Sequence, residues 1–303
     1  MIIITGQTAT GKTKLALEYT KKYNGELINF DSRQVYRYLD IITGKDKETI
    51  QQFKNLAVHL YDIVEPNQYF SSFEYVKIAQ NIIKDIEKRG KTPILVGGSY
   101  FYLKHLLYGF DFKVPPNFKL REKLNKKTVS QLQKMLLGSV LKRTIPQMNH
   151  SDWNNPRRLI RKIEIENDKK TGPVSGSFPS VLASNNTPRL RAAGNPFPST
   201  PVFLFIGFRY KNKDDLIKAI KARVEKRLKQ GAIEEVRSLL KKGYKKTDPG
   251  LKTIGYKQII DYLEKKITKE EAIEKWITAE IQYAKRQLTF MKKDPNIKWR
   301  KIK

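Results

Sequence analysis

The segment that most restricts the fold of this chain is Gly6-Gln7-Thr8-Ala9-Thr10-Gly11-Lys12-Thr13, which matches the phosphate-binding pattern GxxxxGK[ST]. It follows the apolar run Ile2–Thr5, which is typical of a strand buried on both faces, and it precedes Lys14–Lys22, for which we expect a helix. This order turns backbone N–H groups and the positive end of a helix toward one anion. The sequence therefore predicts that these eight residues bind a diphosphate, with Lys12 on its outer oxygens and the Thr13 hydroxyl as a ligand of Mg²⁺.

Further along the chain, apolar strand patterns alternate with helical ones. Leu27–Phe30 and Pro93–Val96 have strand character, and residues 73–86 between them keep helical spacing behind a Ser71 or Ser72 cap. This rhythm predicts an α/β fold of P-loop NTPase type, a parallel sheet flanked by helices. We expect the sheet to resume at Val202–Gly207.

Changes in composition divide the chain into four expected segments. These are a P-loop α/β core in residues 1–110, a smaller basic helical insertion in residues 111–166, a flexible loop rich in Ser, Pro and Asn in residues 167–201, and residues 202–303, with the return strand of the core and a helical C-terminal part.

The net charge points to a polyanionic partner. The chain has 60 Lys and Arg residues against 30 Asp and Glu residues, a formal charge of +30. The excess lies mainly at residues 111–170, with fifteen basic against six acidic residues, and at residues 241–303, with eighteen against eight. A basic surface can simply keep a protein solvated, but this uneven distribution favours nucleic acid.

The chain has no cysteine, which excludes disulfides and thiolate metal sites and fits a reducing cytoplasm. No run approaches the roughly 20 apolar residues that a membrane span needs. We therefore expect a soluble, cytoplasmic protein with no membrane partner.

Asp31 ends the strand Leu27–Phe30, so we expect it at the carboxyl edge of the sheet beside the phosphate-binding loop. A carboxylate there can take a proton from an acceptor or act on metal-bound water. Alternatively, Asp31 caps a helix that begins in the residues after it. An ordinary P-loop NTPase needs an acidic residue after a second strand, but Pro93–Val96 runs into Gly97-Gly98-Ser99 instead.

Several motifs occur in a fixed order along the chain. They are Gly6–Thr13, Asp31-Ser32 with Tyr36, Asp40-Ile41, Thr43-Gly44-Lys45, His59–Ile63, Pro93–Ser99, Asn155–Leu159 with Arg161, Arg223 with Arg227, Gly255-Tyr256, and Lys285-Arg286-Gln287. This set resembles the tRNA dimethylallyltransferase (isopentenyltransferase) family of bacterial type, over about residues 1–165 and 202–300. Arg33 and Gln34 depart from the smaller or apolar residues usual there, and Lys252 and Lys257 stand where arginine is frequent.

The resemblance implies transfer of a prenyl group from dimethylallyl diphosphate to N6 of the adenosine 3′-adjacent to the tRNA anticodon. It assigns Asp31 as the base, and Lys12, Thr13 with Mg²⁺, and Arg227 as the groups that stabilise the leaving diphosphate, with Arg223 as a further diphosphate ligand. The adenosine is expected to flip out of its stack. The implied tRNA contacts are Asp31, Ser32, Arg33, Gln34 and Ser99 near the base, and Arg157, Arg158, Arg161, Lys252, Gly255, Tyr256 and Lys257 along the anticodon stem-loop.

Three other functions fit parts of the sequence. A nucleoside or nucleotide kinase would use the same loop with ATP as donor, and a related prenyltransferase would act on free adenine nucleotides. A nucleotide-gated RNA-binding protein would have no transfer chemistry. The basic segments argue against free nucleotides as acceptors, and a monomer is the expected state.

Overall fold

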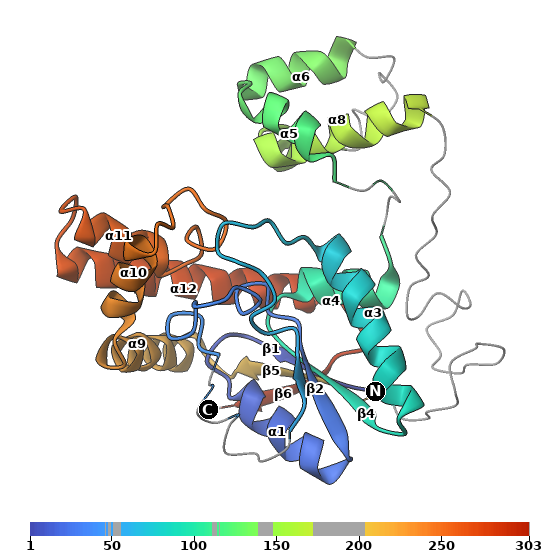
Figure 1. Ribbon diagram of the computed structural model, residues 1–303, viewed down its shortest axis with the longest axis vertical. Coiled ribbons are helices and arrows are strands. Elements are labelled where there is room, and N and C mark those ends of the chain that lie inside the picture. Colours follow the sequence, from blue (N-terminus) through green and yellow to red (C-terminus); the bar gives the residue numbers. More distant parts are fainter. Residues whose placement is uncertain are drawn as a thin grey trace. The chain divides into compact units, whose positions relative to one another are not determined.

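The computed structural model describes residues 1–45, 47, 50, 56–110, 114, 116–138, 148–171 and 204–302. The chain divides into two compact units, Met1–Tyr108 with Val181–Lys303, and Gly109–Ser180 (Figure 1). Among the described residues, no helix is both long and apolar enough to span a membrane.

The first unit is built on a six-stranded parallel sheet with the strand order β3-β2-β4-β1-β5-β6. The strands are β1 (Ile2–Gly6), β2 (Gly25–Asn29), β3 (Val58–His59), β4 (Thr92–Val96), β5 (Leu204–Tyr210) and β6 (Lys298–Ile302). The central strand β1 is buried along its whole length, as its unbroken β-branched run predicts. The predicted α/β fold is confirmed, although β5 ends three residues later than expected; residues 202 and 203 lie outside the described residues. The short edge strand β3 and the lysine-rich edge strand β6 were not predicted, because neither has an apolar pattern.

The strand order creates a crevice at the carboxyl ends of β1 and β4. The chain leaves β1 for β2 on one side, and β5 is added on the other side of β1. Ligands of parallel α/β sheets bind at such a switch point. Gly6–Thr13, Asp31 and Gly97–Ser99 lie in the loops that follow β1, β2 and β4, as the sequence predicts.

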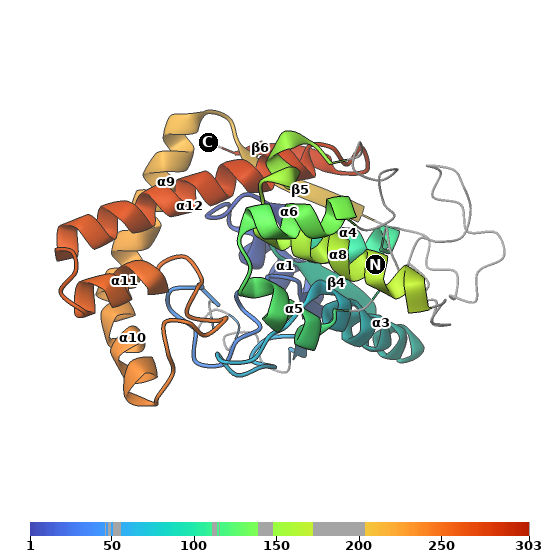
Figure 2. The same cartoon turned by 90° about the horizontal axis from the view of Figure 1, so that it is seen from above.

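The described part of this unit contains the following helices. They are α1 (Lys12–Lys22), α3 (Ser72–Lys88), α4 (Tyr100–Tyr108), α9 (Lys213–Lys229), α10 (Ala232–Lys241), α11 (Tyr256–Leu263) and α12 (Lys269–Met291). In Figures 1 and 2, α9, α10 and α11 gather on one side of the sheet, and α12 runs from them toward α4. Ser71, one of the two caps expected before residues 73–86, forms a capping box, and so does Thr268 at the start of α12.

A second apolar core joins the residues after β2 to the C-terminal helices. Leu39 and Ile42 pack with the fully buried Trp276 of α12 and with the apolar faces of α10 and α11. The Glu235 carboxylate of α10 accepts hydrogen bonds from the backbone N–H groups of residues 40, 41 and 42, at 2.8, 2.6 and 3.2 Å. This anchor fixes the segment that reaches Gly44.

The second unit is helical. Helices α5 (Phe118–Asn125), α6 (Val129–Gly138), α7 (His150–Trp153) and α8 (Pro156–Thr171) enclose a small core that includes Leu132 and Leu159. Helix α8 continues to Thr171, so the sequence-based boundary at residue 167 between helix and loop was placed too early. Residues 167–170 carry no apolar side chain that would reveal the helix, but nothing before Gly172 breaks its backbone hydrogen bonding. Residues 172–201 lie outside the described residues.

Candidate active site

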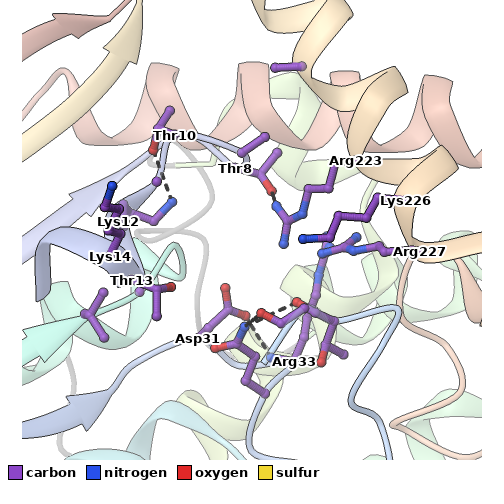
Figure 3. A pocket seen from close by; sticks show the side chains of 18 of the residues that line it. Thr8, Thr10, Lys12, Thr13, Lys14, Asp31, Arg33, Arg223, Lys226 and Arg227 are labelled. Atoms are coloured by element: carbon purple, nitrogen blue, oxygen red, sulfur yellow. Dashed lines mark hydrogen bonds between the residues drawn. The ribbon is translucent and has the colours of Figure 1, made fainter. Parts of the chain in front are cut away.

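A pocket of about 660 Å³ lies at the carboxyl edge of the sheet, within the first unit. Its walls come from the loop before α1, the turn after β2, and helix α9, and α12 adds Tyr283 and Gln287. Figure 3 shows Lys12, Thr13 and Lys14 on one side, Arg223, Lys226 and Arg227 on the opposite side, and Asp31 with Arg33 between them. The volume suits a small ligand.

The loop before α1 has the backbone that its glycines predict. Gly6 has φ 135°, and a Cβ there would lie 2.2 Å from the carbonyl oxygen of Phe208. Gly11 has φ 75° and is the N-cap of α1. The carbonyl of Gln7 accepts hydrogen bonds from the Thr10 hydroxyl at 2.8 Å and from the Lys12 ammonium at 2.6 Å. The helix begins at Lys12, two residues earlier than predicted, so Lys12 and Thr13 belong to its first turn.

Two glutamine side chains fix this loop to its neighbours. Gln7 donates to the carbonyl of Ala284 at 3.4 Å and accepts the backbone N–H of Tyr210 at 3.0 Å. Gln287 accepts the backbone N–H of Thr8 at 3.0 Å and donates to the carbonyl of Gly98 at 2.8 Å. The motif Lys285-Arg286-Gln287 includes this residue, but the sequence does not indicate its part in the site. The buried amide links the phosphate-binding loop to the turn after β4.

Helix α9 supplies the basic wall. Arg223 donates to the Thr8 hydroxyl, and Arg227 is only 4% exposed. Gly44 packs against both guanidinium groups, because a Cβ there would lie 2.5 Å from Nη2 of Arg227 and 2.7 Å from Nη2 of Arg223. Lys226 also lines the pocket and was not predicted, although its i+3 spacing from Arg223 places both on one helical face.

Asp31 lies at the pocket floor at the end of β2. Its backbone N–H donates to Asn29 Oδ1 at 2.8 Å, and its Oδ1 accepts the backbone N–H of Arg33 at 3.0 Å. The carboxylate therefore stabilises a turn, and the alternative in which it caps a helix is wrong, since residues 32–35 form turns. Ser32 lies beside Ser99, with 2.8 Å between their hydroxyl oxygens.

The two unusual residues after Ser32 are held by the protein itself. Gln34 donates through Nε2 to the carbonyls of Thr43 and Gly44, at 3.2 and 2.8 Å. The Arg33 guanidinium lies 3.2 Å from Glu280 Oε1 and stacks on the ring of Tyr283, with 3.8 Å from Cζ to the ring centroid. Both side chains line the pocket while making these internal contacts.

Of the expected contacts near residue 255, two face solvent and two do not. Lys252 and Lys257 are exposed, but Gly255 and Tyr256 are buried. The Tyr256 hydroxyl donates to Glu235 at 2.5 Å. Burial, and to a smaller extent the negative charge of Glu235, raise the pKa of Tyr256 well above its ordinary value. A Cβ at position 255 would lie 2.4 Å from Ile42 Cγ2. The expectation that Gly255 and Tyr256 contact tRNA is therefore corrected: both support the core.

The expected arginines of the second unit also differ in exposure. Arg157 and Arg158 are exposed at the start of α8, and Arg158 forms an ion pair with Asp152. Arg161 is half-buried and binds Glu164 at 2.5 Å and the carbonyl of Val114 at 2.6 Å. Burial alone would raise the pKa of Glu164, but Arg121 and Arg161 hold it below its ordinary value. Arg161 thus serves the packing of its own unit.

Together, the parallel sheet, the glycine-containing loop before α1 and the basic pocket define a protein of P-loop-like α/β fold with a pocket suited to an anionic ligand. A family model described as IPP transferase matches residues 34–294. The chain belongs to this IPP transferase family. The matched range begins after Asp31 and the phosphate-binding loop, so the family model gives no support for the roles of those residues, which are argued from the geometry of the pocket alone.

Relatives of nearly the same length agree with this assignment. The chain is 38% identical to the tRNA dimethylallyltransferase of Caldanaerobacter subterraneus subsp. tengcongensis, over 99% of this chain and 90% of the relative. It is 38% identical to that of Carboxydothermus hydrogenoformans, over 99% and 91%. Among solved structures, the full-length tRNA isopentenylpyrophosphate transferase of Bacillus halodurans matches with a TM-score of 0.67 and 30% identity, over 99% of this chain and 89% of that one. A eukaryotic dimethylallyltransferase acting on tRNA shares the fold, with a TM-score of 0.72, 24% identity, and coverage of 99% and 73%.

Proposed function

We propose that this protein transfers a dimethylallyl group from dimethylallyl diphosphate to N6 of the adenosine 3′-adjacent to the anticodon of tRNA. Membership of the family and the names of its relatives favour tRNA prenylation over phosphoryl transfer and over prenylation of free nucleotides. The observation that carries the assignment of the site is the pocket itself, where Asp31 lies between two groups of cations.

In the proposed reaction, the cations and Asp31 have different roles. N6 attacks C1 of the prenyl group, the bond from C1 to the diphosphate oxygen breaks, and the bonding electrons leave with diphosphate. Lys12, Arg223 and Arg227 stabilise the charge that grows on the leaving group. Asp31 accepts the proton that N6 loses. The carboxylate is held by the Arg33 N–H through one oxygen, which leaves its other oxygen for the substrate.

The site also fits Mg²⁺ bound together with the substrate. The described residues contain no group of three or more His, Cys, Asp or Glu side chains that would hold a metal by themselves. Thr13 lines the pocket, and its hydroxyl together with diphosphate oxygens and water would supply the oxygen ligands that Mg²⁺ prefers. Such an ion would neutralise charge on the leaving diphosphate.

The tRNA is proposed to approach the acceptor side of the pocket, where Asp31, Ser32 and Ser99 meet. An adenosine must leave its stack to reach this depth. Arg157, Arg158, Lys252 and Lys257 are exposed and remain the proposed phosphate contacts. We propose that the enzyme acts as a monomer in the cytoplasm.

The proposal is tested by incubating the purified protein with dimethylallyl diphosphate, Mg²⁺ and unmodified tRNA, followed by nucleoside analysis. We expect N6-dimethylallyladenosine, with no such product from AMP and no phosphoryl transfer from ATP. The Asp31→Ala variant should bind tRNA normally and lose most turnover. Phosphoryl transfer without alkylation would refute the proposed reaction. Full alkylation by Asp31→Ala would refute the role of Asp31 as the base, and tRNA binding by the parent protein without alkylation would support an RNA-binding role.

A further inference from the structure

Glu280 of α12 is a buried carboxylate among the basic residues of the pocket. Its side chain is 4% exposed, and its Oε1 lies 3.2 Å from Nη1 of Arg33 and 3.8 Å from Nη1 of Arg227. These two arginine side chains are themselves only 15% and 5% exposed. Burial alone would raise the pKa of Glu280, but Arg33, Arg227 and Arg223 outweigh it and hold the pKa below its ordinary value. Glu280 is therefore an anion at neutral pH.

On the acceptor side, Glu280 acts through Arg33. The Arg33 guanidinium is fixed between the Glu280 carboxylate and the Tyr283 ring, one helical turn further along α12. The backbone N–H of the same Arg33 donates to Asp31 Oδ1. The position of the Asp31 carboxylate thus depends on the position of residue 33, which depends on α12.

The donor side of the pocket is the side where Lys12, Arg223 and Arg227 are proposed to bind the diphosphate. On this side, Glu280 acts through Arg227. This guanidinium lies against Gly44 together with that of Arg223, which in turn bonds to Thr8 of the phosphate-binding loop. Two like-charged guanidinium groups so close together repel each other, and the repulsion is strong where water is excluded. A buried carboxylate beside one of them reduces this repulsion and gives Arg227 a fixed orientation.

We infer that Glu280 is a positioning residue that holds the donor and acceptor sides of the pocket in register, through Arg227 and Arg33. The inference rests on the proposed function and adds a residue that contacts neither substrate in that mechanism.

The charges predict an unequal effect of single and double substitutions. Glu280→Gln removes a buried negative charge from beside the buried Arg33 and Arg227 and leaves both cations in place, which is the costly way to break a buried ion pair. Removing Arg33 as well takes away one of the two cations that face Glu280. The double variant Arg33→Met/Glu280→Gln should therefore be less impaired than Glu280→Gln alone.

The test compares Glu280→Gln, Arg33→Met, the double variant and the control Glu274→Gln, which removes an exposed carboxylate from the same helix. Kinetics are measured separately for dimethylallyl diphosphate and for tRNA, with melting temperatures for all variants. We expect Glu280→Gln to lower kcat/KM about ten- to hundred-fold, with a raised KM for the diphosphate. Arg33→Met should lower kcat and leave the KM of the diphosphate unaltered. The kcat/KM of the double variant should be several-fold higher than that of Glu280→Gln, and Glu274→Gln should match the parent protein.

A double variant that is no better than Glu280→Gln, or a Glu280→Gln variant that behaves like Glu274→Gln, would overturn the inference. Calorimetric titration with inorganic pyrophosphate and Mg²⁺ tests the donor side independently of catalysis. If Glu280→Gln does not fold, the double variant is compared with Arg33→Met: several-fold weaker pyrophosphate binding supports the inference, and equal binding refutes it. If the parent protein binds pyrophosphate but alkylates no tRNA, the proposed function fails, whereas the positioning of Arg227 is still decided by this titration.

Discussion

Gly44 offers a sharp test of how closely the pocket arginines are placed. Its φ of 67° lies in the left-handed region, and an added Cβ would lie 2.5 Å from Nη2 of Arg227 and 2.7 Å from Nη2 of Arg223. Ordinary contacts of a Cβ begin near 3.4 Å, so the two guanidinium groups must retreat by about 0.9 and 0.7 Å. Neither can move freely, because Arg227 is buried beside Glu280 and Arg223 bonds to Thr8.

Two separate effects follow from Gly44→Ala. Placing a Cβ in the left-handed region costs about 1 kcal/mol of stability, which corresponds to roughly 1.5–2 °C in melting temperature for a chain of 303 residues. If these arginines bind the leaving diphosphate as proposed, displacing them by nearly 1 Å costs about a hundred-fold in rate. We therefore expect kcat/KM for dimethylallyl diphosphate to fall about a hundred-fold, or about 2.7 kcal/mol of transition-state stabilisation.

Gly90→Ala is the matched control. Gly90 has φ 71°, and a Cβ there would meet nothing within 4 Å. It should lose stability to a similar degree while keeping the parent kcat/KM. Steady-state kinetics of tRNA alkylation and thermal unfolding are measured for both variants. If Gly44→Ala keeps the parent kcat/KM and loses only the stability that Gly90→Ala loses, the close packing of the arginines has no catalytic meaning.

Three further predictions concern residues outside the pocket. Tyr256→Phe removes the hydroxyl that donates to Glu235 and should cost about 1 kcal/mol in denaturant unfolding without changing tRNA affinity; weaker tRNA binding at unchanged stability would contradict the buried role. Arg157→Ala should weaken tRNA binding and reduce the slope of log K against log salt by about 1, with unchanged melting temperature; an unaltered slope would show that this exposed residue is only solvated. Glu26 is buried, and its hydrogen bonds with Arg89 lower its pKa far below the ordinary 4.5, against the opposing effect of burial. Its stabilising contribution is therefore complete above pH 4.5 and is lost as the pH falls toward the lowered pKa. Glu26→Gln should be destabilised at pH 7 and progressively less so below pH 4.5 in chemical denaturation, and a pH-independent difference would rule this out.

The sequence by itself determined the parts of the protein whose conformation is encoded locally. The buried run Ile2–Thr5 followed by glycines and a helix predicted the phosphate-binding loop, because Gly6 and Gly11 adopt backbone angles that other residues disfavour. Strand ends in a parallel sheet meet at one edge, so the position of Asp31 beside this loop also followed from the pattern. The prediction that Asp31 lies there holds, and its chemical role stays a prediction.

Only the tertiary structure decided which distant side chains meet. The contact between Arg33 and Glu280 joins residues 247 positions apart, and the contact between Thr8 and Gln287 spans 279. Neither has a local signal, because each depends on how α12 packs across the sheet. Packing likewise buried Tyr256 and turned it from an expected RNA contact into a support for residues 40–42. Backbone preferences act over a few neighbouring residues, whereas burial and charge pairing depend on the whole packed chain.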